Sequence, residues 1–504
     1  MKTLIAGLAI TAGIAGAGYM ATPYLAAGQI EEFFAQPERR IPMMDQGFAW
    51  KGGSFQRGWW ESTAVSTLKM HLDLDQTVDL PLRHVVHQGL GTDLSWARIE
   101  TTLEITEEDR ALVRHYFGEQ APLRIVTTLF LDGHQESRIE SPSFNTPMLE
   151  DPSSRLEWGG ITGYANSPQA DVLSLHIEAP RVALTDAATA LEMESLVLSG
   201  DLKADAQIGS TGTGEVVLRR LTVKGEDGNI QLSGLSLNSS ARREGPLFGV
   251  DARLRMDHFE ADDQRFDDLR LNWRVDRLDV AAYERMQTRL QSAMEPPAND
   301  EEEAQARQIQ RLAQSLEEFL PSSPEFELTE LAFRTPQGEV RMEGRARYDA
   351  SAAPAKAALA ERLPAVQAHL ALQLPEALLS EVLQGVLVEQ LESMQEMMGA
   401  AAEEIDAKAQ ATAMSGEMLA ALKNEGWLKS DKSNLMARLE LKQGNATIND
   451  QPAEALMLQL MPLLMGGEAA EVDVEEVEEA EDAEASVEAE EAEAAVEAGK
   501  AEAQ

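Results

Sequence analysis

The feature that most constrains this chain is a strict alternation of apolar and polar residues that recurs along most of its length. Clear runs lie at residues 68–74, 173–177, 250–256, 269–275, 340–348 and 435–441. Successive side chains of a β-strand point to opposite faces, so such a run predicts a strand with one dry face and one wet face.

Short turn signals separate the runs, as at Asp227-Gly228-Asn229, Gln337-Gly338 and Gln443-Gly444-Asn445. Alternating strands joined by short turns are typical of antiparallel pairing. We therefore predict a mainly β fold of the α+β class, with a long, curled antiparallel sheet. Its dry face must curl on itself, be covered by one or two amphipathic helices, or hold an apolar ligand.

Two segments change to a helical period, at about 280–320 and 375–424. The first is interrupted by Pro296-Pro297 and by acidic residues 300–303. In the second, apolar residues recur at spacings of three or four, which predicts an amphipathic helix that covers the sheet or lines an apolar groove. These residues are Leu379, Leu383, Val386, Leu387, Leu391, Met394 and Met398.

The N-terminus predicts a membrane anchor. Lys2 precedes an uncharged apolar stretch that continues to about residue 27, a length that fits one spanning helix. Small residues around Ala15 and Ala17 also resemble a signal-peptidase site, so cleavage remains the alternative. An uncut helix would leave the bulk of the chain in the periplasm of a Gram-negative bacterium. The residues that would anchor it in the inner membrane are Leu4, Ile5, Leu8, Ile10, Ile14 and Tyr19.

Charge divides the rest of the chain into two parts. The whole sequence of 504 residues carries a net charge of −43, and residues 467–504 contribute sixteen acidic residues against one lysine. We expect a β-rich domain at 28–466 and a disordered acidic tail at 467–504. The apolar patch at 456–465 is too short to span a bilayer. So acidic a chain is a poor nucleic-acid binder, because phosphate contacts need clustered Lys and Arg.

The sequence nominates no catalytic, cofactor-binding or metal-binding residue. It has no cysteine, no His-Glu-x-x-His and no Gly-x-Ser-x-Gly. The glycine-rich stretch 209–214 lacks the Gly-Lys-Ser/Thr of a phosphate loop, so it predicts a turn. His84 and His87 are the nearest histidine pair, and two ligands alone do not make a metal site. We expect a protein that is not an enzyme and has no cofactor.

Four motifs, taken in order, resemble the YdgA-like family of bacterial proteins. They are 57–62 (Arg-Gly-Trp-Trp-Glu-Ser), 84–89 (His-Val-Val-His-Gln-Gly), 158–163 (Trp-Gly-Gly-Ile-Thr-Gly) and the unit from Asn424 to Asn449. Gln88-Gly89 stands where the family usually has Gly-Pro, and Asp450 stands where a glycine is common. The resemblance covers residues up to about 452 and implies a periplasmic protein anchored in the inner membrane, with no established activity.

Three classes of function fit these expectations. The first is a binding module whose dry face holds a lipid or another apolar ligand in envelope maintenance. The second is a scaffold of the inner membrane that self-associates, for example as a homodimer, or binds another envelope protein. The third is an enzyme acting on envelope components, for which no nucleophile or base is nominated.

Overall fold

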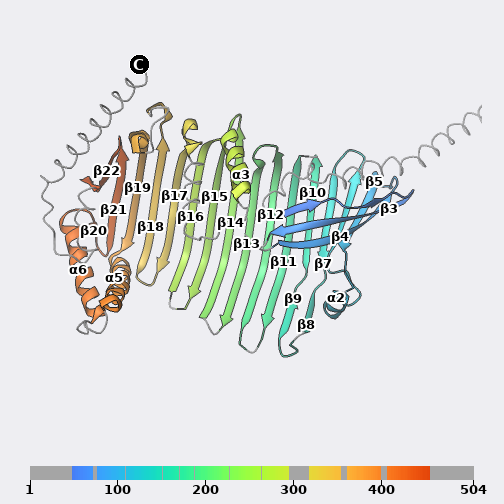
Figure 1. Ribbon diagram of the computed structural model, residues 1–504, viewed down its shortest axis with the longest axis horizontal. Helices are drawn as coiled ribbons and strands as arrows, with labels where there is room; N and C mark the ends of the chain where they lie inside the picture. The colour runs from blue at the N-terminus through green and yellow to red at the C-terminus, as the bar shows by residue number, and fades with distance from the viewer. Residues whose placement is uncertain are drawn as a thin grey trace, which may run out of the picture.

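The computed structural model describes residues 48–71, 77–107, 109–149, 151–169, 171–186, 188–225, 228–262, 264–293, 317–352, 360–398 and 406–453. Within them, 23 strands join into one continuous antiparallel sheet that forms a long, broad layer (Figure 1). This confirms the prediction of a mainly β fold built on a large antiparallel sheet.

The N-terminal strands are β1 (Phe48–Lys51), β2 (Phe55–Gln56), β3 (Glu61–His71), β4 (Thr77–Gln88), β5 (Ser95–Leu103), β6 (Arg124–Phe130), β7 (Gln135–Ser141), β8 (Phe144–Pro147) and β9 (Arg155–Trp158). The long strands that follow are β10 (Ile161–Gln169), β11 (Val172–Thr185), β12 (Ala190–Asp205), β13 (Gly209–Gly225), β14 (Gly228–Glu244), β15 (Leu247–Ala261) and β16 (Gln264–Asp279). The C-terminal strands are β17 (Glu325–Thr335), β18 (Gly338–Tyr348), β19 (Val366–Pro375), β20 (Lys429–Asp431), β21 (Asn434–Lys442), β22 (Asn445–Ile448) and β23 (Gln451–Pro452).

Few helices accompany the sheet. The described α-helices are α2 (Arg110–Phe117), α3 (Val280–Ala293), α5 (Glu376–Met398) and α6 (Ala407–Asn424), with short 3-10 turns at η3 (Leu320–Ser322), η4 (Ala350–Ala352) and η5 (Ala360–Ala365). The helical period predicted at 375–424 is confirmed by α5 and α6. For 280–320 the structure shows α3, and residues 294–316 lie outside the described part.

Most neighbours in the sheet are also neighbours in sequence. From β10 to β19 each strand pairs with the next one along the chain. Beyond β19, the next strand in the sheet is β21, which is reached after α5 and α6. At the other end β10 pairs with β7, and the sheet continues through β6, β5 and β4 to β3. The blue strands around β3 cross in front of the long strands in Figure 1, so this end of the sheet curls over.

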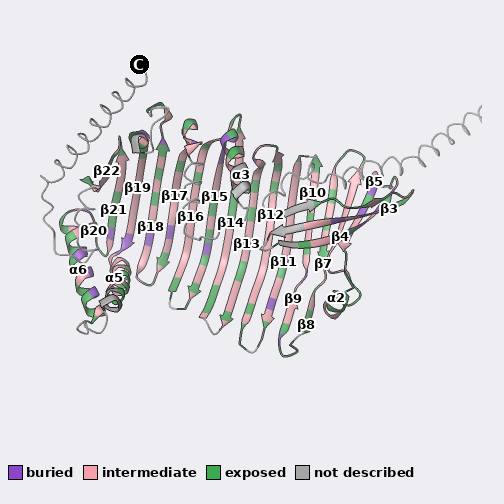
Figure 2. Cartoon of the chain, viewed as in Figure 1, coloured by how far each residue is buried: buried purple, intermediate pink, exposed green. Residues whose placement is uncertain are grey.

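Two groups of well-buried residues lie at the ends of the sheet. One cluster contains Ala64, Val86, Ala97 and Ile99 of β3 to β5. At the opposite end, Trp427 and Leu435 are buried beside the helical pair. Between these ends the long strands are coloured almost entirely as half-buried or exposed (Figure 2). In β12, β13 and β14 no described residue is buried.

The alternating runs and the glycine-rich stretch can be compared directly with the observed strands. All six alternating runs lie in strands, as far as the described residues reach. The glycine-rich stretch 209–214 was predicted to be a turn, and this is wrong: β13 begins at Gly209, and Gly212 and Gly214 pair with Leu202 and Gly200 of β12. The glycines continue the ladder because a residue without a side chain still supplies backbone hydrogen bonds.

The expected N-terminal anchor, the apolar patch at 456–465 and the acidic tail lie outside the described residues. In the part of the chain that is described, no helix combines the length and the apolarity needed to cross a membrane.

Candidate functional site

One row of directly paired residues runs across the long strands and is apolar at every position. Residues that oppose each other in an antiparallel pair carry their side chains on the same face of the sheet. The register therefore places one side chain from each of β11 to β18 in a line. In order they are Ile177, Leu198, Val216, Leu237, Leu254, Leu271, Leu331 and Met342.

Two parallel rows on the same eight strands extend this face. One contains Leu175, Gly200, Gly214, Ser239, Ala252, Trp273, Leu328 and Gly344, and the other contains Leu173, Leu202, Gly212, Ala241, Val250, Val275, Phe326 and Ala346. None of these positions is charged, although 26% of the chain is charged. We call the three rows the apolar face.

The apolar face extends over a broad part of the sheet. Strands lie about 4.8 Å apart and same-face residues about 6.8 Å apart, so three rows on eight strands occupy about 700 Å². Leu237, at the centre, is 38% exposed, and Phe326 near one end is 43% exposed. Ala252 is 6% exposed, and most other positions of the face are half-buried, so the face is only partly open to solvent.

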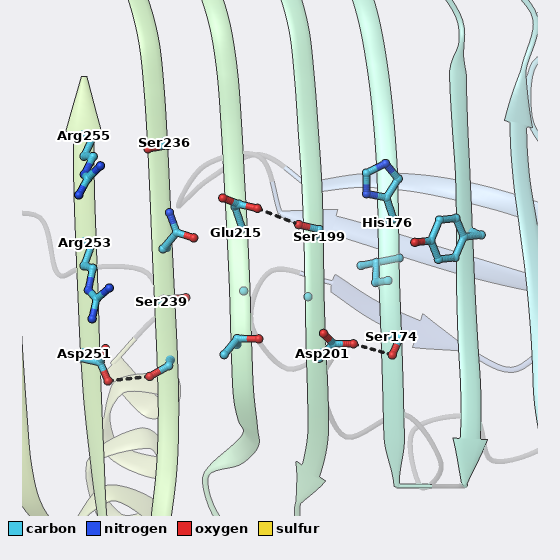
Figure 3. A pocket seen from close by; sticks show the side chains of 17 residues that line it. Ser174, His176, Ser199, Asp201, Glu215, Ser236, Ser239, Asp251, Arg253 and Arg255 are labelled. Atoms are coloured by element: carbon cyan, nitrogen blue, oxygen red, sulfur yellow. Dashed lines mark hydrogen bonds between the residues drawn. The ribbon is translucent and has the colours of Figure 1, made fainter. Parts of the chain in front are cut away.

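The opposite face is polar and crossed by ion pairs. Arg242 lies 3.1 Å from Asp251, Arg345 lies 2.8 Å from Glu325, and Arg270 lies 3.3 Å from Glu330. Figure 3 looks onto this polar face, and there α3 and the N-terminal strands stand behind the sheet. In Figure 1 the same elements stand in front, so both lie on the side of the apolar face.

Described elements cover the apolar face only in places. Helix α3 packs over one end of the long strands, where Val280 joins Ile208 and Phe248 in a buried cluster. Tyr283 of α3 meets Phe248 edge to face, with ring centroids 5.1 Å apart. The curled N-terminal end continues the same face: from Gly163 the central row runs through Ile139, Ile125, Thr101 and His84. There the face is filled by its own side chains.

Helix α5 carries the apolar stripe singled out from the sequence. Leu387 is 2% exposed, Leu379, Leu383 and Leu391 are half-buried, and Val386 is 52% exposed. Met394 and Met398 are within α5, but their side chains are outside the described part. The helix packs mainly against α6 and meets the sheet at β19. Among the described residues the long strands β12 to β14 therefore have no helix of this pair over them.

The motif at 84–89 places its two histidines on opposite faces of β4, because they are three residues apart. His84 is 1% exposed, and its ring nitrogens lie 2.7 Å from Ser66 Oγ and 2.8 Å from Thr101 Oγ1. Burial lowers the pKa of His84 to about 4. His87 is exposed and lies 3.5 Å from Glu61. The two rings cannot share a metal ion, and within the described residues no three metal-binding side chains are grouped.

The motifs behind the family resemblance contain side chains that join separate segments of the chain by hydrogen bonds. Gln88 Nε2 donates a hydrogen bond to Ser62 Oγ over 2.5 Å, which joins the motifs at 84–89 and 57–62. Asn449 Nδ2 donates to the carbonyl of Trp427 over 2.8 Å, which closes the C-terminal unit. Sequence reasoning singled out these positions but not the rows of the apolar face, because cross-strand register is not visible in a sequence.

Fold and site together define a class: a broad antiparallel sheet, curled at one end, with one partly open apolar face and one ion-paired polar face. The chain belongs to the family described as bacterial protein of unknown function (DUF945), whose model matches residues 1–455. No curated protein matches the chain. No solved structure matches it either. The family description carries no activity.

Proposed function

We propose that this protein is a tethered envelope protein that holds the acyl chains of lipids on its apolar face without catalysing a reaction. The observation that carries the proposal is the uncharged central row from Ile177 to Met342, which is half-buried except at the exposed Leu237. Covering apolar surface gains about 25 cal/mol per Å², so covering this face gives on the order of 10 kcal/mol before the costs of association.

The chemistry of the face favours acyl chains over a protein partner. The three rows consist of aliphatic and small residues, with Trp273 and Phe326 as their aromatic members. Protein interfaces concentrate binding energy in Tyr, Trp and Arg anchors, whereas acyl chains need only apolar area. A face of Leu, Val and Ile over many strands matches the second requirement.

The lipid proposal is tested by matched pairs of substitutions on the full-length protein after gentle extraction. Leu198→Asp with Leu237→Asp places two charges on the apolar face. Ser199→Asp with Asn238→Asp places the same charges on the same two strands, on the polar face. Native mass spectrometry should find co-purifying lipid on the wild type and on the second variant, with most of it lost from the first.

Three results would contradict lipid binding. The wild type could emerge free of lipid, or both variants could retain it equally. Sedimentation could also find a wild-type dimer that only the first variant disrupts, which would assign the apolar face to a second copy of the chain.

The localisation of the protein is part of the same proposal and rests on the N-terminal stretch of the sequence. We infer that the chain is held by an uncut helix in the inner membrane with its sheet in the periplasm. A C-terminal fusion to a reporter active only outside the cytoplasm should be active and remain with the membrane fraction. If a reporter that is active only in the cytosol were active instead, the proposed localisation would be wrong.

A further inference from the structure

A second surface, on the polar face, has the features of a ligand site of a different kind. A depression of about 840 Å³ lies over β10 to β15 and is lined by hydroxyl, amide, carboxylate and guanidinium groups (Figure 3). One row of directly paired residues crosses it from edge to edge: Tyr164, His176, Ser199, Glu215, Asn238 and Arg253. Six strands at about 4.8 Å spacing make this row about 24 Å long.

One end of the depression presents two guanidinium groups for which the described part of the chain offers no carboxylate partner. Arg253 and Arg255 are exposed on the same face of β15, and within the described residues neither has an ion pair. Two of the nearby carboxylates are paired with other groups. Asp251 accepts hydrogen bonds from Ser240 and Arg242, while Glu330 is held by Arg270 and by the amide of Asn272.

Arg253 and Arg255 lie two residues apart on one face of a strand, in a chain whose net charge is −43. Two guanidinium forks side by side are suited to a phosphate or carboxylate, which they bind by charge-assisted hydrogen bonds. Ser236 opposes Arg255 and Asn238 opposes Arg253, so further hydrogen-bonding groups stand beside both forks.

The middle and the far end of the depression suit the hydroxyl groups of sugars. Asp201 accepts a hydrogen bond from Ser174 over 2.6 Å, and Glu215 lies at the centre of the row with its carboxylate toward Ser199. Carboxylates accept hydrogen bonds readily from ligand hydroxyls. At the far end Tyr164 is 56% exposed and stacks on His176 with ring centroids 5.4 Å apart, which offers a flat apolar platform.

We propose that this polar depression binds an extended acidic oligosaccharide. Its phosphate or carboxylate lies between Arg253 and Arg255, its hydroxyls meet Asp201 and Glu215, and a sugar ring rests on Tyr164. The charged side chains of the site lie on the polar face, while Leu175, Gly200, Gly214 and Ser239 of the apolar face also line the depression. The substitutions that test the site are made at residues of the polar face, so they test it separately from lipid binding.

The test uses the full-length protein and isothermal titration calorimetry with three probes: an oligogalacturonate, inorganic phosphate and the neutral maltohexaose. The double variant Arg253→Gln with Arg255→Gln should bind oligogalacturonate about tenfold or more weakly than the wild type, because it removes charge-assisted hydrogen bonds. The control Arg83→Gln with Arg219→Gln removes the same charge outside the depression and should change affinity less than about twofold.

A third variant separates the two ends of the site. Tyr164→Ala should weaken oligogalacturonate binding and leave phosphate binding unchanged, because the ring contacts the sugar and not the anion. The proposal is overturned if the wild type binds none of the probes or binds maltohexaose as tightly as oligogalacturonate. It is equally overturned if the arginine variant matches its control, provided that circular dichroism finds both folded. If phosphate alone binds, the site takes a free anion and the saccharide assignment is wrong.

Discussion

Acidification should loosen the curled N-terminal end of the sheet through His84. The ring is 1% exposed, and burial lowers its pKa from 6.5 to about 4. Its folded-state pKa is below the unfolded value, so the stability contributed by neutral His84 is fully present above pH 6.5 and is lost as the pH falls toward 4. A difference of this size corresponds to about 3 kcal/mol when complete, and about 2 kcal/mol is already lost at pH 5.

Hydrogen exchange of the amides in β3, β4 and β5, corrected for the intrinsic effect of pH, measures this loss locally. Between pH 7 and pH 5 the protection of these strands should fall about 30-fold more in the wild type than in His84→Gln. The comparison cancels every effect of pH that does not involve His84. His87→Gln is the matched control, since His87 lies on the same strand but faces solvent.

The reasoning is refuted if His84→Gln and the wild type lose protection in parallel between pH 7 and pH 5. It is also refuted if His87→Gln removes the pH dependence as fully as His84→Gln does. A nuclear magnetic resonance titration of the His84 ring that places its pKa near 6.5 would remove the premise directly.

Three further substitutions probe packing, turn geometry and capping. Leu435 is 0% exposed, so Leu435→Ala should lower the free energy of unfolding, measured in urea, by about 2–5 kcal/mol. Leu237→Ala on the apolar face should lower it by less than about 1 kcal/mol. Equal losses of stability would mean that the face is covered. Asp450→Gly should stabilise the protein by about 0.5 kcal/mol and so raise the midpoint of thermal unfolding, because Asp450 has φ +75° in the tight turn between β22 and β23. A lowered midpoint would contradict this. Asp406→Ala should cost about 1 kcal/mol by circular dichroism melting, since the Asp406 carboxylate caps α6 by accepting from Ala409 N; an unchanged melt would show that the cap contributes nothing.

The structure explains what the two departures from the family motifs change. Asn449 and Asp450 both adopt positive φ, +49° and +75°, in the two-residue turn after Ile448. Such a turn prefers Asn followed by Gly, so the glycine expected at 450 is the residue that the backbone favours there. In the other motif, Gln88 donates a hydrogen bond to Ser62 through its side chain, a role that the glycine usual at this position could not fill.

Much of the sheet could be read from local pattern, because a period of two is set by the pleat of the strand itself. Alternation at 250–256 and 269–275 predicted β15 and β16, and the change of period at 375 predicted α5. The glycine-rich stretch 209–214 misled because glycine is typical of turns, while here paired neighbours on both sides hold it in a strand. The surface against which α5 packs could not be predicted, since an apolar stripe does not specify its partner.

By itself, the sequence determined that this chain forms strands with one apolar and one polar side, since that depends only on the order of residues along each strand. Only the tertiary structure decided that Leu198, Leu237 and Leu271 stand in one line, because register is set between strands. It also decided that Arg253 shares a depression with Tyr164, and that the apolar face is filled at its curled end and partly open at its centre. Those outcomes depend on which surfaces meet in space, and no periodicity within a strand contains that information.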